Sequence, residues 1–382
     1  MSGDPQQDYF ADGMVEEIIT ALSRIRWLFV IARNSSFTYK GQAVDVKQVG
    51  RELGVRYVLE GSVRKAGGRV RITAQLIDAL SGTHLWADRF DGSLEDVFEL
   101  QNRVAIGVAG VIEPALEAAE VRRAAERPTS DPTAYDLYLR ALPALYSFSK
   151  EGIFRALSLL ERAIARDPGF AQALGAAANC CMHLDLDGWS GNVERNRRTG
   201  IDYGRRALVA AGEEPDVLAI AAVTLAYHGE DIGTMIRVLD RALALNPSYA
   251  RGWYLSGVLQ LWAGDPDDAI ERVKRSISLS PRTSVGSQLS YIGLAYLLKQ
   301  QFSEAEANLL MAIQQRPSNP NAYRWLAACY AHIGRPAEAR DAIERIRAAG
   351  SEPMAASFAF LRNPEHRRFY LSGLRLAAGE MT

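Results

Sequence analysis

Apolar residues change their spacing along this chain, from a mixture of helical and strand-like patterns to helical patterns alone. Met14, Ile18 and Leu22 recur every three to four residues, which indicates an amphipathic helix. A shorter helical pattern occupies residues 46–53 and ends at a glycine. The apolar run at 28–31, between these two patterns, indicates a buried strand.

The period then falls to two, which is typical of half-buried strands. Apolar residues occupy alternate positions at Val55, Tyr57, Leu59 and Val63, and again at Val70, Ile72, Ala74 and Leu76. The turn at 65–69 makes these two segments a hairpin, and a second turn at 81–82 leads into a strand around 84–87. A long helical pattern follows from Ser93. These elements predict a small α+β domain over residues 1–127, with helices and one mixed sheet.

Residues 128–132 contain two prolines and small polar side chains, which indicates a linker, and only helical patterns follow it. These patterns repeat at intervals of 34 or 36 residues. The repeating positions are Pro247, Pro281 and Pro317, then Ala269, Ala305 and Ala339, and Gly257 with Gly293. A small residue at a fixed place lets two helices approach closely, and the proline ends each unit.

These units resemble tetratricopeptide repeats, in which about 34 residues form a pair of helices. We expect about six repeats over residues 133–352, arranged as an all-α superhelix after the α+β domain. A C-terminal helical cap over 353–382 would cover the apolar end of the array, because terminal repeats need a polar outer face. Deleting that cap should cause aggregation.

A second resemblance covers the first domain. The strings Tyr9–Met14, Val30–Phe37, Leu53–Arg64, Ile72–Asp78 and His84–Ala87 look like those of the TolB-like amino-terminal domain. In that family the domain precedes tetratricopeptide repeats. The resemblance implies the C-terminal half of a bacterial signalling protein. Upstream of it lies a class III adenylate or guanylate cyclase domain, or a winged-helix DNA-binding domain.

The chain departs from that family at its start. The family begins with an apolar strand before the segment matched here by Gly3-Asp4-Pro5, so Met1 stands where that strand should have passed. We therefore expect either a fragment or a start placed too late, and a sheet that lacks one strand. The open edge, expected beside 28–31, would allow a homo-oligomer. The expected compartment is the cytoplasm, or the periplasm if the parent has an upstream transmembrane helix.

Composition excludes several classes of protein. Lys and Arg number 44 and Asp and Glu number 45, and neither part of the chain is basic, so nucleic-acid binding is not expected. The 3 cysteines predict no disulfide framework. The apolar runs are too short for a membrane segment. No phosphate-binding or dinucleotide motif occurs, so no cofactor is expected.

Two clusters in the repeats have a chemical and a structural interpretation. His183, Asp185 and Asp187 lie close together, which suits a metal ion, but a polar loop between helices explains them as well and is favoured. Cys180 and Cys181 lack the spacing of a redox pair, so buried packing is favoured over redox chemistry.

Two further clusters lie in the first domain. Basic residues between Arg64 and Arg71 form a hairpin tip that either contacts phosphate or is a solvated strand face, and the second is favoured. Arg33, Asn34, Ser35 and Ser36 follow the expected strand at 28–31. They form a candidate small-ligand loop, although a loop that fixes the next helix is the favoured interpretation.

The candidate partner site is the inner row of the repeats, because the first helix of each tetratricopeptide unit lines a concave groove. Helical spacing selects the inward positions Asn179, His183, Tyr227, His228, Arg251, Tyr254, Trp262, Arg324 and His332. Aromatic residues and arginine are enriched in interfaces, which favours an extended peptide or an acidic partner segment. Three of these residues are histidines, which predicts pH-dependent binding between about pH 5 and 8. The alternative is that the row packs against neighbouring repeats or the first domain.

Three functions remain in competition: a regulatory and scaffolding module that binds a peptide or protein, an enzyme by its cyclase parentage, and the sensor half of a winged-helix regulator. For this chain we expect the first, with the cyclase as its context. No catalytic residue, metal or turnover is expected, because the repeats bring together no nucleophile and base.

Overall fold

The computed structural model describes most of the chain: residues 5–23, 33–42, 44–66, 69–93, 133–147, 149–279, 285–348, 350–354 and 358–380, and positions 25, 28, 30–31, 104–105, 107–112, 115–116 and 119. The chain divides into two compact units, and the boundary between them lies near residue 122. The expected linker at 128–132 falls outside the described residues.

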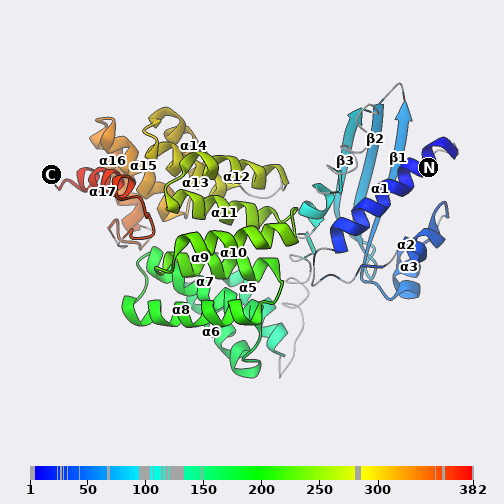
Figure 1. The fold of residues 1–382 in the computed structure, drawn as a ribbon. Helices are drawn as coiled ribbons and strands as arrows, with labels where there is room; N and C mark the ends of the chain where they lie inside the picture. The colour runs from blue at the N-terminus through cyan, green and yellow to red at the C-terminus, as the bar shows by residue number, and fades with distance from the viewer. Residues whose placement is uncertain are drawn as a thin grey trace. The chain divides into compact units, whose positions relative to one another are not determined.

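The first unit is built on a three-stranded antiparallel sheet (Figure 1). Its elements are α1 (Pro5–Ser23), α2 (Arg33–Ser36), the 3-10 helix η1 (Phe37–Tyr39), α3 (Val46–Leu53), β1 (Tyr57–Ala66), β2 (Arg69–Asp78) and β3 (His84–Ser93). The strand order is β1-β2-β3. The pairing of β1 with β2 runs from Tyr57 opposite Asp78 to Ala66 opposite Arg69, so only Gly67 and Gly68 separate the two strands.

One face of this sheet carries the core of the first unit. Along β2 the side chains alternate between exposed and buried, as a strand with one covered face requires. Val70, Ile72 and Leu76 are buried and pack in one cluster with Met14 and Ile18 of α1. The predicted hairpin, the two helices around it and the α+β class are confirmed.

The sheet differs from the prediction in one respect, because its described strands are all antiparallel rather than mixed. The expected strand at 28–31 has no regular structure at its described positions 28, 30 and 31. Leu28 and Val30 instead pack half-buried against the core. Periodicity cannot separate a short apolar strand from a buried irregular segment, which is why the pattern misled. Homo-oligomerisation through a sheet edge stays a prediction.

The second unit is a series of helix pairs (Figure 1). The pairs are α5 (Ala134–Tyr146) with α6 (Lys150–Arg166), α7 (Ala171–Leu186) with α8 (Val193–Ala210), α9 (Pro215–Tyr227) with α10 (Ile232–Leu245), α11 (Ala250–Ala263) with α12 (Pro266–Leu279), α13 (Gly286–Leu298) with α14 (Phe302–Gln315), and α15 (Pro320–His332) with α16 (Pro336–Ala348). The helix α17 (Pro364–Ala378) follows them. None of the described helices is long and apolar enough to cross a membrane.

Small residues let the two helices of a pair approach closely, as the repeat spacing predicts. A Cβ atom added to Gly257 of α11 would lie 2.5 Å from a methyl of Val273 in α12. One added to Gly293 of α13 would lie 2.6 Å from Cγ of Leu309 in α14. Real Cβ atoms do not approach that closely, so both positions need glycine. First helices of successive pairs also contact one another, for example α7 with α9 and α9 with α11.

The last helix, α17, packs on α15 and α16, where Tyr370 and Leu374 are buried. Leu376 of the same helix is exposed. The described residues between α16 and α17, which are 351–354 and 358–363, form neither helix nor strand. We call residues 351–363 the C-terminal segment.

Candidate partner-binding site

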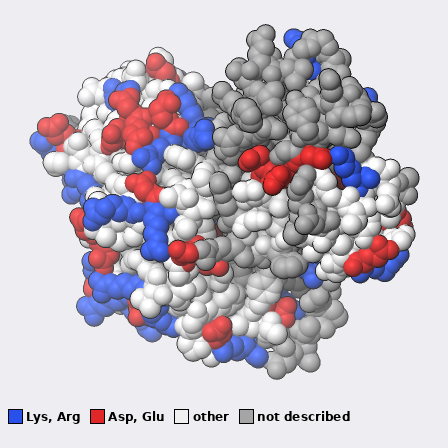
Figure 2. All heavy atoms as spheres, turned by 45° about the vertical axis from the view of Figure 1, so that its right-hand side comes forward, with Lys and Arg blue, Asp and Glu red and all other residues white. Residues whose placement is uncertain are grey.

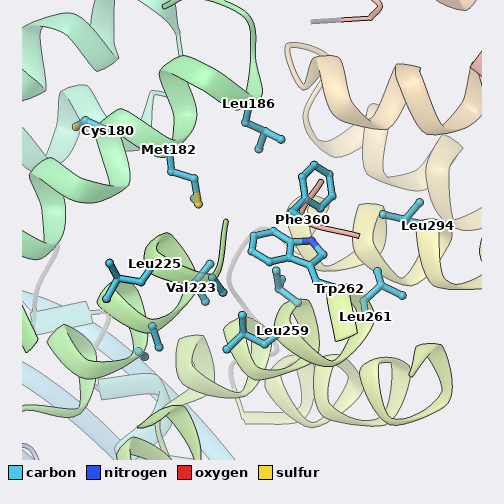
Figure 3. Packing of buried hydrophobic residues seen from close by; sticks show 14 of the residues in the cluster. Cys180, Met182, Leu186, Val223, Leu225, Leu259, Leu261, Trp262, Leu294 and Phe360 are labelled. Carbon is cyan, nitrogen blue, oxygen red and sulfur yellow. The ribbon is translucent and has the colours of Figure 1, made fainter. Parts of the chain in front are cut away.

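The C-terminal segment contacts two of the predicted partner-binding residues. The ring of Phe360 stacks on Tyr227 of α9 with centroids 5.7 Å apart, and lies 5.1 Å from the ring of Trp262 in α11. Figure 3 shows Phe360 beside the Trp262 indole, with Leu186, Leu261 and Leu294 around them. Phe360 is 5% exposed and Trp262 is 1% exposed, so the chain itself covers this part of the inner row.

A polar network holds the start of the segment. Arg324 of α15 is 1% exposed and donates to Oγ of Ser351 at 2.5 Å and to the carbonyl of Glu352 at 2.9 Å. Ser351 donates in turn to the carbonyl of Asp187 at 2.6 Å, and Arg324 lies 3.8 Å from the Asp187 carboxylate. Asn321 also donates to that carboxylate, at 3.2 Å. The second and sixth helix pairs are therefore joined through one buried arginine.

Arg362 holds the other end of the segment to the ends of two helices. Its guanidinium donates to the carbonyl of Ala226 at 2.5 Å and to that of Glu230 at 3.3 Å. Its backbone N–H donates to the carbonyl of Trp262 at 2.7 Å. The last carbonyls of a helix lack intrahelical donors, and a cation there is favoured by the helix dipole. Arg362 supplies both a donor and a charge. We call Tyr227, Trp262, Arg324 and their contacts with residues 351–363 the segment site.

A second aromatic group lies on α11, α13 and α15. Tyr291 meets Tyr254 edge to face with centroids 5.7 Å apart, and meets Trp325 in the same way at 5.1 Å. Tyr254 and Tyr291 are half-buried, and burial raises the pKa of both hydroxyls, which therefore stay protonated at neutral pH. Arg316, at the end of α14, is also half-buried and donates to Ser287 at 3.0 Å. We call Tyr254, Tyr291 and Trp325 the tyrosine row.

The three predicted histidines have different surroundings. His228 is 4% exposed, and burial lowers its pKa to about 4. The ring of His332 stacks on the ring of Phe369 in α17 with centroids 4.1 Å apart, and its Nε2 is hydrogen-bonded to the Phe369 carbonyl at 3.0 Å. Burial lowers the pKa of His332 as well. His183 lies 3.8 Å from the Asp187 carboxylate. The expected titration between pH 5 and 8 is wrong for His228, because burial keeps its ring neutral over that range.

The remaining predicted residues lie apart from the segment. Arg251 donates to the hydroxyl of Tyr146 at 2.9 Å, and its guanidinium lies 5.5 Å from the centre of that ring. Asn179 is buried within α7. The predicted ligand loop of Arg33, Asn34, Ser35 and Ser36 is the short helix α2, and the side chains of Arg33 and Asn34 fall outside the described residues. It does not follow a strand, because 28–31 forms none at its described positions.

The three other clusters differ in their surroundings. Cys180 and Cys181 are fully buried, and burial raises the pKa of Cys181 to about 12, which suppresses the reactive thiolate. In the part of the chain that is described, no group of three His, Cys, Asp or Glu side chains could hold a metal ion. Asp185 and Asp187 are nevertheless buried at the end of α7 rather than lying in an exposed loop. Arg71, in the basic hairpin, pairs with Asp91 at 2.7 Å.

Sequence reasoning missed the residues that come from outside the first helices. Phe360 and Arg362 belong to a segment that was assigned to the cap, and Arg316 ends a second helix. Tyr291, on the first helix α13, was not among the inward positions that helical spacing selected. A search for aromatic residues in alternate positions after the last repeat would have found Phe358 and Phe360.

Charge is mixed on the surface. On the face shown in Figure 2, acidic and basic side chains of the described residues lie next to one another. On α8, Arg198 pairs with Glu194 and Arg206 pairs with Asp202.

Comparison with known proteins supports the assignment of the helix pairs as tetratricopeptide repeats. Residues 236–282 and 296–358 each match a family model described as tetratricopeptide repeat. A protein of Rhizobium meliloti (strain 1021) named "Putative adenylate cyclase 3" is 43% identical over 227 residues, which cover 59% of this chain and 39% of that protein. The cytochrome c-type biogenesis protein CycH of the same strain is 30% identical over 145 residues, 37% of each chain. The chain spans about two fifths of the length of these curated relatives.

Solved structures share the architecture. The human IFIT1 dimer with m7Gppp-AAAA is similar with a TM-score of 0.50 and 14% identity, over 88% of this chain and 73% of that one. At this identity the likeness shows the fold alone. Together with the helix pairs and the two matched regions, it establishes that the second part of this chain contains tetratricopeptide repeats.

Proposed function

We propose that this chain is a non-catalytic module whose repeats bind an extended peptide or a protein partner and so regulate a signalling protein. The observation that carries the proposal is the C-terminal segment. First helices of the repeats hold it by aromatic stacking on Phe360 and by hydrogen bonds to its backbone at Glu352 and Arg362. The inner row therefore has the chemistry that binds an irregular peptide.

Half-buried residues beside the segment site support binding of a second chain. Arg251, Tyr254, Tyr291 and Arg316 are half-buried, and they combine aromatic area with positive charge. Tyrosine and arginine dominate the energetics of many interfaces. An acidic or extended partner segment across these residues is the ligand that we propose.

The wider context is also a proposal. The strings quoted above support a TolB-like domain before the repeats, and the relative named for an adenylate cyclase supports a cyclase-type parent over a winged-helix regulator. The activity in that relative's name belongs to that protein, of which the alignment covers 39%. In this context the chain would be a regulatory part, with the cytoplasm as the expected compartment.

Partner capture by the full chain tests the proposal. Wild-type protein and the double variant Arg251→Ala, Tyr254→Ala serve as baits in a lysate, and bound proteins are identified by mass spectrometry. The matched control is Phe154→Ala, Arg155→Ala, which removes one aromatic and one arginine from exposed positions of α6. We expect specific partners to be lost from the first variant only. If both variants retain every partner, the inner row is not the binding surface.

The non-catalytic part of the proposal has its own test. The purified full chain, incubated with ATP or GTP and a divalent cation, is expected to form no cyclic nucleotide above the blank. Formation of a cyclic nucleotide that is lost on a point substitution in this chain would contradict the proposal.

A further inference from the structure

The outer face of the three-stranded sheet, opposite the core of the first unit, carries several exposed arginines. Side chains alternate across a strand, so the residues that pair with the exposed positions of β2 share this face. Strand pairing arranges them in adjacent rows. Starting at the turn between β1 and β2, the rows contain Arg69, then Arg64, Arg71 and Asp91, then Ser62, Thr73 and Arg89. We call these residues the arginine face.

The charges on the arginine face do not balance, because Asp91 is its one carboxylate. Arg71 donates to Oδ1 of Asp91 at 2.7 Å, and Nε of Arg89 lies 3.4 Å from Oδ2. The Arg71 guanidinium holds the pKa of Asp91 below its usual value, and the charges of Arg89 and Arg69 act in the same sense. The side chains of Arg64 and Arg69 are exposed, and neither forms a hydrogen bond or ion pair with another described residue. The face therefore has an excess of positive charge.

Two of the arginines lie directly opposite each other. Arg64 of β1 pairs with Arg71 of β2, and like charges in this arrangement are destabilising. The next pair along the same strands is favourable, since the hydroxyls of Ser62 and Thr73 lie 2.8 Å apart. Asp91 compensates the charge of Arg71 but leaves that of Arg64. A departure from a local stability rule without such compensation is expected at functional sites.

The contacts of Asp91 indicate which anion suits this face. One arginine approaches each of its two carboxylate oxygens. The planar guanidinium group matches a carboxylate in geometry and in charge. None of the residues of the arginine face is aromatic, so the bases of a single-stranded nucleic acid would lack the stacking contacts that such binding uses. Carboxylates are therefore favoured over nucleic acid.

The spacing of the two arginines without ion pairs suits an extended chain. Arg64 and Arg69 lie diagonally across two paired strands, and diagonal neighbours are about 7–8 Å apart. Side chains two positions apart in an extended segment are separated by about 6.6–6.8 Å. Acidic residues in alternate positions would therefore reach both arginines.

We propose that the arginine face binds an extended acidic segment of a partner protein, with Asp or Glu in alternate positions. The carboxylates of the partner pair with Arg64 and Arg69, beside the carboxylate that Asp91 supplies. The proposed function concerns the inner row of the repeats, so this is a second binding surface on the first unit and does not depend on the first.

The probe is a fluorescently labelled peptide of alternating glutamate and serine, and its control has glutamine in place of glutamate. Anisotropy measures its binding to the full chain at low ionic strength. We expect wild-type protein to bind the glutamate probe only, and added salt to weaken the complex. Arg64→Gln with Arg69→Gln should weaken binding by a factor of about 3 or more. The matched control, Arg155→Gln with Arg162→Gln, changes two exposed arginines of α6 and should bind as the wild type does.

The substitution Asp91→Asn gives a result of the opposite sign. It removes the carboxylate that Arg71 and Arg89 contact, so both become available to the probe and binding should tighten. Equal or weaker binding by Asp91→Asn would overturn the inference. So would a wild-type protein that does not distinguish the glutamate probe from its glutamine control.

A stability measurement shows that the arginines act on the ligand rather than on the fold. Arg64→Gln removes the repulsion from Arg71, so urea denaturation should show equal or greater stability than the wild type. A loss of stability together with weaker binding would assign Arg64 a structural role and overturn the inference.

Three further outcomes would assign the probe to another site or another partner, and each would overturn the inference. Loss of binding in Arg251→Ala with Tyr254→Ala, but not in the arginine-face variant, would place the acidic segment on the inner row and support the proposed function. An oligothymidylate that displaces the probe better than unlabelled glutamate peptide does would identify nucleic acid as the partner. A wild-type dimer that dissociates in Arg64→Gln would identify a second copy of the chain.

Discussion

The segment site and the tyrosine row are built from the same residue types on successive first helices, but they differ in what completes them. In the segment site, Tyr227 and Trp262 contact Phe360, which comes from outside the repeats. In the tyrosine row, Tyr291 contacts Tyr254 and Trp325, which belong to the repeats themselves. Composition along the inner row is therefore a poor guide to which part is available to a partner.

The two predicted arginines make the same contrast. Arg324 is buried with Asp187 and the start of the C-terminal segment. Arg251 is half-buried and contacts Tyr146. Both arginines join distant parts of the array, but Arg324 does so in a buried charged network, whereas Arg251 does so through one half-buried contact with Tyr146.

Substitution of Arg324 is expected to have the largest effect on the free energy of unfolding. Arg324→Ala leaves the Asp187 carboxylate buried without its cation and the Glu352 carbonyl without its donor, so we expect the free energy of unfolding to fall by ~3–5 kcal/mol. Urea denaturation followed by circular dichroism measures this loss. Arg251→Ala is the matched control and should cost less than ~1 kcal/mol, the worth of a cation–π contact near the surface.

A combined substitution shows whether the buried charge is the cause. In Arg324→Met with Asp187→Asn both charges are removed, and we expect a smaller loss than for Arg324→Ala, because no uncompensated charge stays buried. Equal losses would mean that packing of the Arg324 side chain, rather than its pairing, stabilises the array.

The repeats were predictable because their signal is redundant. Glycines such as Gly257 and Gly293 recur at fixed intervals, and each is required by a close helix approach. The hairpin of the first unit was predictable for a similar reason, since alternation along β2 matches one covered face. The run at 28–31 offered only four residues, which is too few to distinguish a strand from a buried irregular segment.

The site was predicted only in part, for a physical reason. Helical spacing places Tyr227, Trp262 and Arg324 on the inner row, but it does not tell which other segment covers them. That depends on residues such as Phe360 and Asp187, which are distant in sequence and obey no repeat. Burial also changes the chemistry of the site, because it lowers the pKa of His228 below the range that is typical of histidine.

The second prediction concerns the pH dependence of stability at the segment site. There the ring centroids of His228 and Tyr227 lie 5.1 Å apart. Burial lowers the His228 pKa from 6.5 to about 4, so below pH 6.5 the unfolded chain binds a proton that the folded chain refuses. Stability therefore falls as pH drops from about 6.5 towards 4. The expected loss between pH 7 and pH 5 is ~2 kcal/mol.

Urea denaturation at both pH values measures this slope. Asp185, 4.0 Å from His228, has a pKa raised by burial and acts in the opposite sense, and Arg197 helps to lower the His228 pKa. In His228→Gln the loss between pH 7 and pH 5 should shrink. A slope that this substitution leaves unchanged would assign the pH dependence to other groups.

The third prediction tests whether the tyrosine row is independent of the segment site. Tyr291→Leu removes two edge-to-face ring contacts, so we expect the free energy of unfolding to fall by ~1–2 kcal/mol. Hydrogen exchange at the Arg362 amide should not change, because the segment is anchored on Tyr227 and Trp262. Faster exchange at Arg362 would show that the two surfaces are coupled.

The smallest expected effect concerns two turns, one after α11, which carries Trp262, and one after α13, which carries Tyr291. Gly264, after α11, has a φ of 109°, and its counterpart 36 residues later, Gln300 after α13, has a φ of 57°. The left-handed region costs a non-glycine residue ~1–2 kcal/mol, and glycine loses ~0.5–1 kcal/mol in chain entropy. Gln300→Gly should therefore stabilise the protein by about 0.5–1 kcal/mol in thermal or urea denaturation. The matched reverse change, Gly264→Ala, should destabilise it, and because the new Cβ would lie 3.0 Å from Cβ of Asn363, it should also accelerate exchange at the Arg362 amide. A loss of stability in Gln300→Gly would show that the Gln300 side chain makes a contribution larger than its backbone strain.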